Sequence, residues 1–186
     1  MKGYFGVGVE GVSKAINVGT LFRTAHAFGA AFVFTLKAQY NSREGFLSDT
    51  SDTPRSVPTY NFVDLEAFRL PQGCRLVGVE ITDAAIELPS FRHPRQAAYI
   101  LGAEREGLSA DVQSLCDYVV KIPTRFSVNL GVAGALIMYD RQLSLGRHAP
   151  RPVAEGAPTE TVELPVFGEP MYKRRQRARQ KAQLKQ

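Results

Sequence analysis

Two polar side chains within an apolar stretch form the first segment that could do chemistry. Residues 17–25 read NVGTLFRTA, so Asn17 and Arg23 stand six positions apart, nearly two turns of a helix. A guanidinium keeps its proton below about pH 12, so Arg23 suits electrostatic stabilisation of an oxyanion better than it suits a base. The alternative is a solvated arginine on the outer face of the helix.

The second segment closes an apolar strand with glycines and charges. Residues 100–108 read ILGAEREGL, so the strand ends at Gly102 and a charged triplet that begins with Glu104 follows. Ligands of open α/β sheets bind beyond the carboxyl ends of strands, and a glycine there lets a ligand approach the backbone. This segment is therefore a candidate ligand-binding loop; the alternative is an ordinary turn that contains glycines.

The third segment places two hydrogen-bonding side chains directly before a helix of small residues. Residues 122–135 read IPTRFSVNLGVAGA, with Ser127 and Asn129 at the start of the helix. These side chains could bind a ligand, or they could cap the helix by accepting hydrogen bonds from its first amides. The small residues that follow make the helix narrow, which suits close packing against another backbone.

A fourth pattern, the glycines of residues 6–11 (GVGVEG), matches the dinucleotide-binding fingerprint but not its context. That fingerprint follows a strand and precedes an acidic residue about twenty positions on. Here only five residues precede Gly6, and the first acidic residue after Gly11 is Glu44. The glycines are therefore expected inside or just after the first strand, and a nicotinamide oxidoreductase is disfavoured.

The elements that would position these segments alternate between strand-like and helix-like patterns. Strands are expected at 4–9, 31–36, 75–81, 97–102 and 119–122, and helices at 16–28, 62–68, 109–115 and 129–145. The alternation predicts an α/β fold with a mainly parallel sheet and helices on both faces. The side chains of the last helix that are expected to face inward are Leu130, Ala133, Leu136, Ile137 and Leu143.

Composition divides the chain into a domain and a charged tail. We expect a domain over residues 1–146, a proline-rich linker or surface wrap over 147–170 and a basic tail over 171–186. Residues 169–186 hold seven lysines and arginines and one acidic residue, whereas the remainder of the chain is close to neutral. A cationic tail on a near-neutral domain indicates a polyanionic partner such as nucleic acid; the alternative is a solvated end.

Other features of the composition exclude several classes of protein. No run of about eighteen apolar residues is present and the first residues lack the pattern of a secretory signal, so a cytoplasmic protein is expected. Cys74 and Cys116 are far apart in apolar surroundings, which favours reduced, buried thiols. The three histidines show no spacing typical of metal ligands, so no metal site is expected.

Taken in order, the three segments resemble the signature motifs of the TrmH/SpoU family of the SPOUT superfamily, over about residues 3–145. Members transfer a methyl group from S-adenosylmethionine to a ribose 2′-hydroxyl of tRNA or rRNA, work as homodimers and carry a C-terminal trefoil knot, an exception to the rule against knots. The resemblance implies active-site residues Asn17, Arg23, Glu104, Ser127 and Asn129. It implies cofactor-binding residues Val79, Gly102, Ile122, Ser127 and Leu130. The chain departs from the family at Gly131, where a serine is usual.

The implied chemistry is an in-line methyl transfer to a weakly acidic hydroxyl. Arg23 would hold the RNA phosphate beside the target ribose and stabilise the developing alkoxide, and Asn17 would orient Arg23 or the ribose. Ser127 and Asn129 would order the third segment and bind cofactor or nucleotide, while Glu104 would anchor its own loop or pair with Arg23. No metal is needed, because the leaving group of S-adenosylmethionine is already activated.

The RNA partner is expected to meet both the domain and the tail. The RNA-binding residues would be Arg23 and the tail residues Lys173, Arg174, Arg175, Arg177 and Arg179. The chain begins almost directly at its first strand, without the extra N-terminal RNA-binding domain of many rRNA-specific members, which favours tRNA over rRNA. The alternative is a catalytically silent, knotted RNA-binding homologue; the presence of all five implied active-site residues disfavours it.

Overall fold

Runs of apolar residues form a seven-stranded sheet in the computed structural model. The structure describes residues 3–12, 14–38, 56–103, 106–146, 148, 151–152 and 155–156. The strands are β1 (Tyr4–Glu10), β2 (Phe32–Leu36), β3 (Thr59–Phe62), β4 (Arg75–Val79), β5 (Ile86–Glu87), β6 (Gln96–Leu101) and β7 (Tyr118–Lys121). They lie in the order β3-β2-β1-β6-β4-β7-β5, and every adjacent pair is parallel. The predicted parallel α/β sheet is confirmed.

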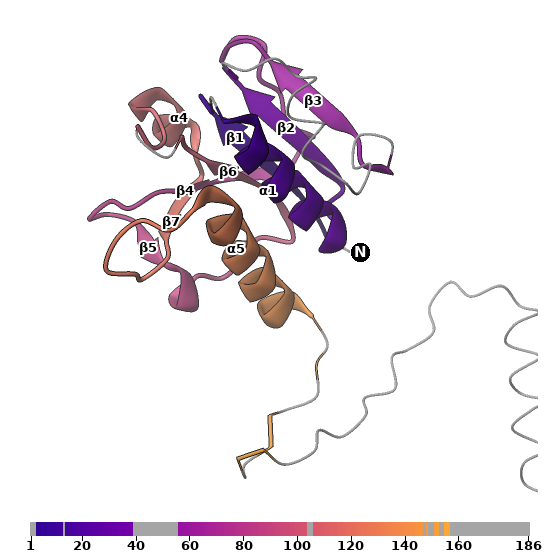
Figure 1. Cartoon of the computed structure of the whole chain (residues 1–186), viewed down its shortest axis with the longest axis vertical. Helices are drawn as coiled ribbons and strands as arrows, with labels where there is room; N and C mark the ends of the chain where they lie inside the picture. The colour runs from indigo at the N-terminus through magenta and orange to yellow at the C-terminus, as the bar shows by residue number, and fades with distance from the viewer. Residues whose placement is uncertain are drawn as a thin grey trace, which may run out of the picture. The chain divides into compact units, whose positions relative to one another are not determined.

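The helices cover both faces of this sheet, as the alternating pattern predicted. Among the described residues they are α1 (Ala15–Ala27), α4 (Ala110–Leu115), α5 (Leu130–Leu145) and the short 3-10 helix η1 (Leu88–Ser90). Figure 1 shows α1 and α5 side by side on one face, where they share a buried apolar cluster with β1. On the other face, Val112 of α4 packs in a second cluster with residues of β2, β4 and β6.

The chain divides into two units, Met1–Gly146 and Arg147–Gln186, and every element named above lies in the first. No helix among the described residues is long and apolar enough to cross a membrane. Glu104 and the tail residues Lys173, Arg174, Arg175, Arg177 and Arg179 lie outside the described residues. The trefoil knot, the linker and the basic tail stay predictions.

The glycines of the fingerprint-like pattern serve the sheet rather than a nucleotide. Gly6 and Gly8 lie within β1, as expected, and Gly11 follows it with a positive φ of 64°. A Cβ atom on Gly8 would stand 2.3 Å from the Phe34 ring, and one on Gly6 would stand equally close to the Phe32 ring. Both distances are far below a carbon–carbon contact, so these glycines make room for the aromatic residues of β2.

The prediction of a helix over residues 62–68 is wrong. Phe62 ends strand β3, and residues 63–67 form a turn whose Ala67 amide donates to Asp64 Oδ1 at 2.8 Å. Phe62, Leu65 and Phe68 follow each other at a spacing of three, which is typical of a helix. Here the two phenylalanines contact a third aromatic ring instead. Phe62 and Phe68 both pack against the buried Phe34 ring, with ring centroids 6.3 and 5.5 Å away. Pairing with β2 and this aromatic cluster therefore decide the local conformation.

Two of the α5 side chains that were expected to face inward face outward. Leu136 and Leu143 are 39% and 38% exposed, whereas Ile137 and Leu130 are buried as predicted and Ala133 is half-buried. The helix is apolar around most of its circumference, so periodicity alone could not identify its buried side. The outward leucines lie on one face with Val132 and Tyr139, which are also exposed.

A buried polar network ties α5 to the sheet at the amino ends of β1 and β6. The Arg141 guanidinium donates to the Tyr99 hydroxyl at 3.2 Å and to the carbonyl oxygens of Tyr4, Pro94 and Arg95. The Asp140 carboxylate can only accept, so His93 Nε2–H donates to Asp140 Oδ2 at 2.8 Å. In a neutral ring Nδ1 then carries no proton and accepts from the Tyr99 hydroxyl at 2.6 Å. The network therefore fits a neutral His93.

We expect this network to make the fold sensitive to acid. Burial lowers the pKa of His93 below its ordinary 6.5, and the hydrogen bond to Asp140 offsets this only in part. At pH values near 6.5 and just below, the unfolded chain therefore binds more protons at His93 than the folded chain does. The contribution of His93 to the free energy of unfolding is fully present above pH 6.5 and declines as the pH falls below it. Thermal unfolding between pH 7.5 and about 5 checks this. His93→Gln should lower the melting temperature at pH 7.5 and flatten its pH dependence; equal slopes for both proteins would contradict the assignment.

Candidate active site

The carboxyl ends of three parallel strands open into a cavity of about 500 Å³. Its walls come from the ends of β4, β6 and β7 and from the start of α5, which Figure 1 shows converging at one edge of the sheet. Parallel strands direct their carboxyl ends to the same edge, where ligands of α/β proteins bind. The lining residues are Val79, Glu80, Ile81, Leu101, Gly102, Ala103, Glu106, Gly107, Lys121, Ile122, Thr124, Ser127, Val128, Asn129, Leu130 and Ala133.

The cavity brings together all five residues that the resemblance implied for the cofactor. Val79, Gly102, Ile122, Ser127 and Leu130 line it, although they are spread over about fifty positions of the sequence. The second and third segments thus meet in space, as strands ending at one sheet edge require. That these residues hold the cofactor stays a prediction.

The structure gives Gly102 a different reason from the one expected. A Cβ atom at Gly102 would stand 2.0 Å from the Gly107 carbonyl carbon and 2.2 Å from the Leu108 nitrogen. A close approach between two stretches of this chain's own backbone therefore already requires a glycine here, and the approach of a ligand stays a prediction. The Gly107 amide also donates to the Ala103 carbonyl at 2.8 Å, and Gly107 has a positive φ of 66°. Gly102 and Gly107 together permit the tight loop that forms one wall of the cavity.

Two carboxylates that the sequence analysis missed hold this loop from both sides. Glu80, just after β4, accepts from the Leu108 amide at 2.6 Å, and Glu10, at the end of β1, accepts from the Ser109 amide at 2.9 Å and the Ser109 hydroxyl at 2.6 Å. Because β1 and β4 flank β6, the two carboxylates fix residues 108–109 beyond the end of the central strand. The available signal was an acidic residue at the end of each buried strand.

Asn129 is both a helix cap and a cavity residue. Its Oδ1 accepts from the Gly131 amide at 2.8 Å and so caps α5, which is the structural alternative weighed for this segment. It also lines the cavity, so the two interpretations do not exclude each other. Ser127 is exposed, lines the cavity and makes no helix-capping hydrogen bond among those described.

Asn17 and Arg23 do not line the cavity. Asn17 is half-buried in the first turn of α1, and Arg23 is exposed on the same helix. The first segment nonetheless packs on the third, because a Cβ atom at Gly134 of α5 would stand 2.1 Å from Leu21 of α1. A Cβ atom at Gly131 would stand 3.0 Å from Thr20 Cγ2, so the glycine in place of the usual serine sits where the two helices meet.

The cavity combines apolar walls with charged groups at defined places. Leu101, Ile122 and Leu130 supply apolar surface, while Glu80, Glu106 and Lys121 supply charge. The Lys121 ammonium donates to the Thr82 carbonyl at 3.3 Å and so crosses from β7 to the segment after β4. Among the described residues, no group of three or more His, Cys, Asp or Glu side chains could hold a metal ion.

This fold and this cavity define a parallel α/β protein with a cavity at the carboxyl ends of its strands. Comparison with known families gives the particular class. Residues 5–139 match the SpoU rRNA Methylase family, which is most of the chain, so the protein belongs to this family. The family resemblance predicted from the three segments is confirmed.

Curated relatives match the same part of the chain. The mouse (Mus musculus) tRNA (guanosine(18)-2′-O)-methyltransferase TARBP1 is 31% identical over 145 residues, which cover 73% of this chain and 9% of the relative. The Escherichia coli K12 tRNA (guanosine(18)-2′-O)-methyltransferase is 28% identical over 139 residues, which cover 72% of this chain and 61% of the relative. The chain thus spans only part of the length of these relatives.

A solved structure shares the fold. The SpoU methyltransferase AviRb from Streptomyces viridochromogenes, crystallised in complex with the cofactor AdoMet, superimposes with a TM-score of 0.67 at 25% identity. The match covers 79% of this chain and 60% of AviRb. This chain therefore shares its fold with AviRb over most of its length.

Proposed function

We propose that this protein transfers a methyl group from S-adenosylmethionine to a ribose 2′-hydroxyl of RNA. The observation that supports this most is the cavity, in which the second and third family segments meet. The relatives named above are tRNA 2′-O-methyltransferases, which favours tRNA over rRNA as the substrate. A catalytically silent RNA-binding homologue is less well supported, because Asn17, Arg23, Ser127 and Asn129 are present and the cavity is formed.

The lining of the cavity suits S-adenosylmethionine. Its volume of about 500 Å³ lies in the range of small-molecule sites, and its apolar walls suit an adenine ring. The carboxylates of Glu80 and Glu106 suit a positively charged ligand with ribose hydroxyls. When bound, the cofactor supplies an activated methyl group. The chain's own task is to place the hydroxyl oxygen in line and to stabilise its negative charge.

Arg23 is our candidate for that electrostatic task, with Asn17 as its orienting neighbour on α1. Because Arg23 does not line the cavity of its own chain, a second surface must bring it to the reaction. We propose that a homodimer does so, with RNA phosphate bound at the junction. Arg23 is exposed on α1, and α1 packs against α5, whose outer face is apolar.

The test of the function is methyl transfer to separated RNA fractions. Protein, radiolabelled S-adenosylmethionine and either tRNA or rRNA are incubated, and the labelled nucleotide is mapped. In parallel, S-adenosylhomocysteine should raise the melting temperature, because a ligand of the native state stabilises it, while NADH should have no effect. If neither RNA carries label, the proposed methyltransferase activity is wrong. If NADH stabilises the protein and S-adenosylhomocysteine does not, S-adenosylmethionine is not the cofactor.

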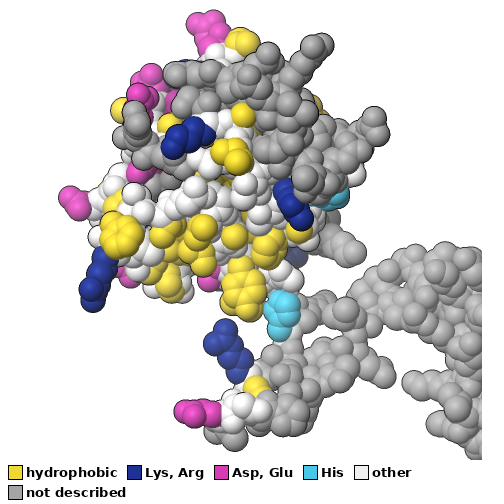
Figure 2. Space-filling view, viewed as in Figure 1, with side chains coloured by type: hydrophobic (Ala, Val, Ile, Leu, Met, Phe, Trp, Pro, Cys, Tyr) yellow, Lys and Arg dark blue, Asp and Glu magenta, His cyan; other side chains and the backbone are white. Residues whose placement is uncertain are grey.

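The outer face of α5 predicts the dimer interface. Val132, Leu136, Tyr139 and Leu143 are 38–53% exposed and follow each other at spacings of four, three and four, one face of a helix. Figure 2 shows hydrophobic side chains gathered over this helix.

A substitution in a twofold interface occurs once in each subunit and so acts twice. Leu136→Glu should therefore raise the dimer dissociation constant by on the order of 100-fold and lower methyl transfer with it. Light scattering at micromolar protein measures this. Leu115→Glu, an exposed position on the other face of the sheet, is the control; a wild-type monomer that is active would contradict the dimer.

The basic tail is proposed to be an RNA-docking arm. Lysines and arginines that neutralise phosphates release counterions, so RNA affinity should fall steeply with salt. Deleting residues 172–186 should weaken RNA binding and reduce the slope of log affinity against log salt by up to about 0.9 for each phosphate that the tail neutralises in the full chain. Binding at several salt concentrations measures both, with S-adenosylhomocysteine affinity as the control. Equal affinities and slopes would show that the tail does not bind RNA.

The expected cytoplasmic location is likewise a proposal. It rests on the RNA substrate and on Cys74 and Cys116, which are free thiols in the structure. Burial raises the pKa of both thiols, to about 11 for Cys116, so neither is a ready nucleophile.

A further inference from the structure

One residue of the third segment has no role so far. Phe126 lies on the loop between β7 and α5, and 78% of its surface is exposed. Its ring contacts no other aromatic ring of the described residues. Large aromatic side chains gain the most from leaving water, so an aromatic ring this exposed beside a functional cavity suggests that a ligand covers it.

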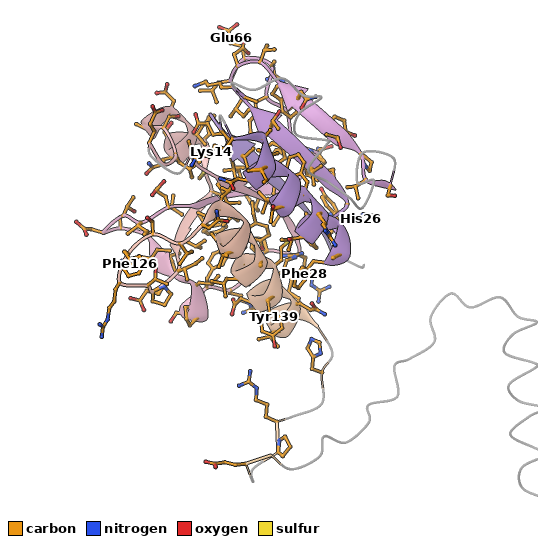
Figure 3. All side chains as sticks on the ribbon, in the orientation of Figure 1. Lys14, His26, Phe28, Glu66, Phe126 and Tyr139 are labelled. Carbon is orange, nitrogen blue, oxygen red and sulfur yellow. The ribbon has the colours of Figure 1, made fainter. Side chains whose placement is uncertain are left out.

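The loop that carries Phe126 is part of the cavity wall and is held by its own hydrogen bonds. Its neighbours Thr124, Ser127 and Val128 line the cavity, whereas Phe126 does not. The Thr124 hydroxyl donates to the Phe126 carbonyl oxygen at 2.8 Å, and the Thr124 amide donates to the Ile122 carbonyl oxygen at 2.8 Å. Figure 3 shows Phe126 at the outer side of this loop, well away from Tyr139 on the α5 face. The loop thus presents an aromatic ring at the rim of the cavity.

The charges beside Phe126 favour a nucleic acid. Arg125, the preceding residue, is exposed, and Lys121 lines the cavity at the base of the same loop. Single-stranded nucleic acids are bound where aromatic rings stack on bases and cationic side chains follow the phosphates. Phe126 directly precedes the cavity residue Ser127 in the sequence. Its ring therefore stands next to the cavity in which the methyl donor is proposed to bind.

On the basis of the proposed function, we infer that Phe126 stacks on a base of the RNA substrate at the mouth of the cofactor cavity. The stacked base belongs to the target nucleotide or to its neighbour, and stacking holds it splayed out so that its ribose faces the methyl donor. Phe126 is therefore a positioning residue that binds RNA and makes no contact with the methyl group. A contact of Phe126 with a second copy of this chain is the competing explanation, and the test separates the two.

Tryptophan fluorescence tests the stacking directly, because the chain contains no tryptophan. Phe126→Trp places a single indole at the loop, and Val63→Trp places one at an equally exposed position, 78%, just after β3. β3 and β7 lie on opposite sides of the sheet's centre, so the control is remote from the cavity. With S-adenosylhomocysteine bound, bulk tRNA at saturating concentration should quench Phe126→Trp strongly and Val63→Trp little. The measurement needs no turnover.

Kinetics of matched variants give a second readout. Phe126→Leu keeps an apolar side chain without a π-face and should raise the KM for RNA by about 5- to 150-fold, the range for loss of one stacked base. Phe126→Tyr keeps the ring and should retain the wild-type KM. The affinity for S-adenosylhomocysteine and the mass by light scattering should be the same in all variants, which a merely structural role or a dimer contact would not allow.

The outcomes distinguish this inference from the proposed function. If the wild-type protein methylates RNA, but tRNA fails to quench Phe126→Trp and Phe126→Leu has the wild-type KM, the stacking is wrong and the methyltransferase stands. If Phe126→Leu is a monomer, or if Phe126→Trp emits as a buried indole before RNA is added, Phe126 belongs to a protein interface and the inference is overturned. If the wild-type protein neither binds nor methylates RNA, the proposed function fails, and the inference fails with it.

Discussion

Arg23→Ala is expected to lower methyl transfer by about 100- to 1,000-fold, the usual effect of removing one preorganised group that stabilises developing negative charge. Cofactor affinity should stay nearly unchanged, since Arg23 lies outside the cofactor cavity. Arg23→Lys should also be poor, because an ammonium cannot reproduce the planar, two-pronged contact of a guanidinium with phosphate. Single-turnover transfer from radiolabelled S-adenosylmethionine to RNA measures the effect.

The matched control for Arg23 is Arg92→Ala. Arg92 is also exposed, but it precedes β6 and so lies towards the opposite edge of the sheet from the cavity. The Arg92→Ala variant should transfer methyl groups at the wild-type rate. Full activity of Arg23→Ala, or an equal loss in both variants, would remove Arg23 from the mechanism.

Gly102→Ala is expected to weaken S-adenosylhomocysteine binding by about 10- to 100-fold, because an extra carbon in a packed site shifts the backbone and so removes contacts of the cavity wall with the ligand. The added Cβ would meet the backbone of Gly107 and Leu108, which cannot move aside like the end of a side chain. The loop must therefore shift, and it forms a wall of the cavity. Isothermal titration with S-adenosylhomocysteine measures the change, with a cooperative thermal transition to show that the variant folds.

Gly29→Ala separates this local effect from a general loss of stability. Gly29 ends α1 with a positive φ of 76°, and a Cβ atom there would meet no other atom within 4 Å, so alanine brings strain without a clash. Placing a non-glycine residue in that conformation costs about 1 kcal/mol, and Gly29→Ala should bind S-adenosylhomocysteine like the wild type. Unchanged binding in Gly102→Ala would show that the loop does not shape the site.

The sequence alone predicted those parts of the protein that depend on local pattern. Buried strands appear as continuous apolar runs, so β2 and β6 were found where residues 31–36 and 97–102 predicted them. The alternation of strands and helices predicted the parallel sheet, and the three motif segments predicted the family. These features depend on the pattern of neighbouring residues, which is why the sequence is enough to predict them.

The tertiary structure decided whatever depends on residues that are distant in sequence. Glu10 holds Ser109 across ninety-nine positions, and no local pattern couples the two. The spacing of Phe62 and Phe68 predicted a helix, but a parallel strand partner and the Phe34 ring were available and prevailed. In the same way, an apolar helix has several faces that could be buried, and only packing against α1 and the sheet left Leu136 outside.

The same distinction holds for the site. Residue types and spacing identified Gly102, Ser127 and Asn129 as candidates, because backbone freedom and hydrogen-bonding groups are properties of single residues. That they meet around one cavity, and that Arg23 lies outside it, follows from the strand order and the packing of α1 on α5. Chemistry is carried by the side chains, whereas the distances between them are set by contacts that only the folded chain makes.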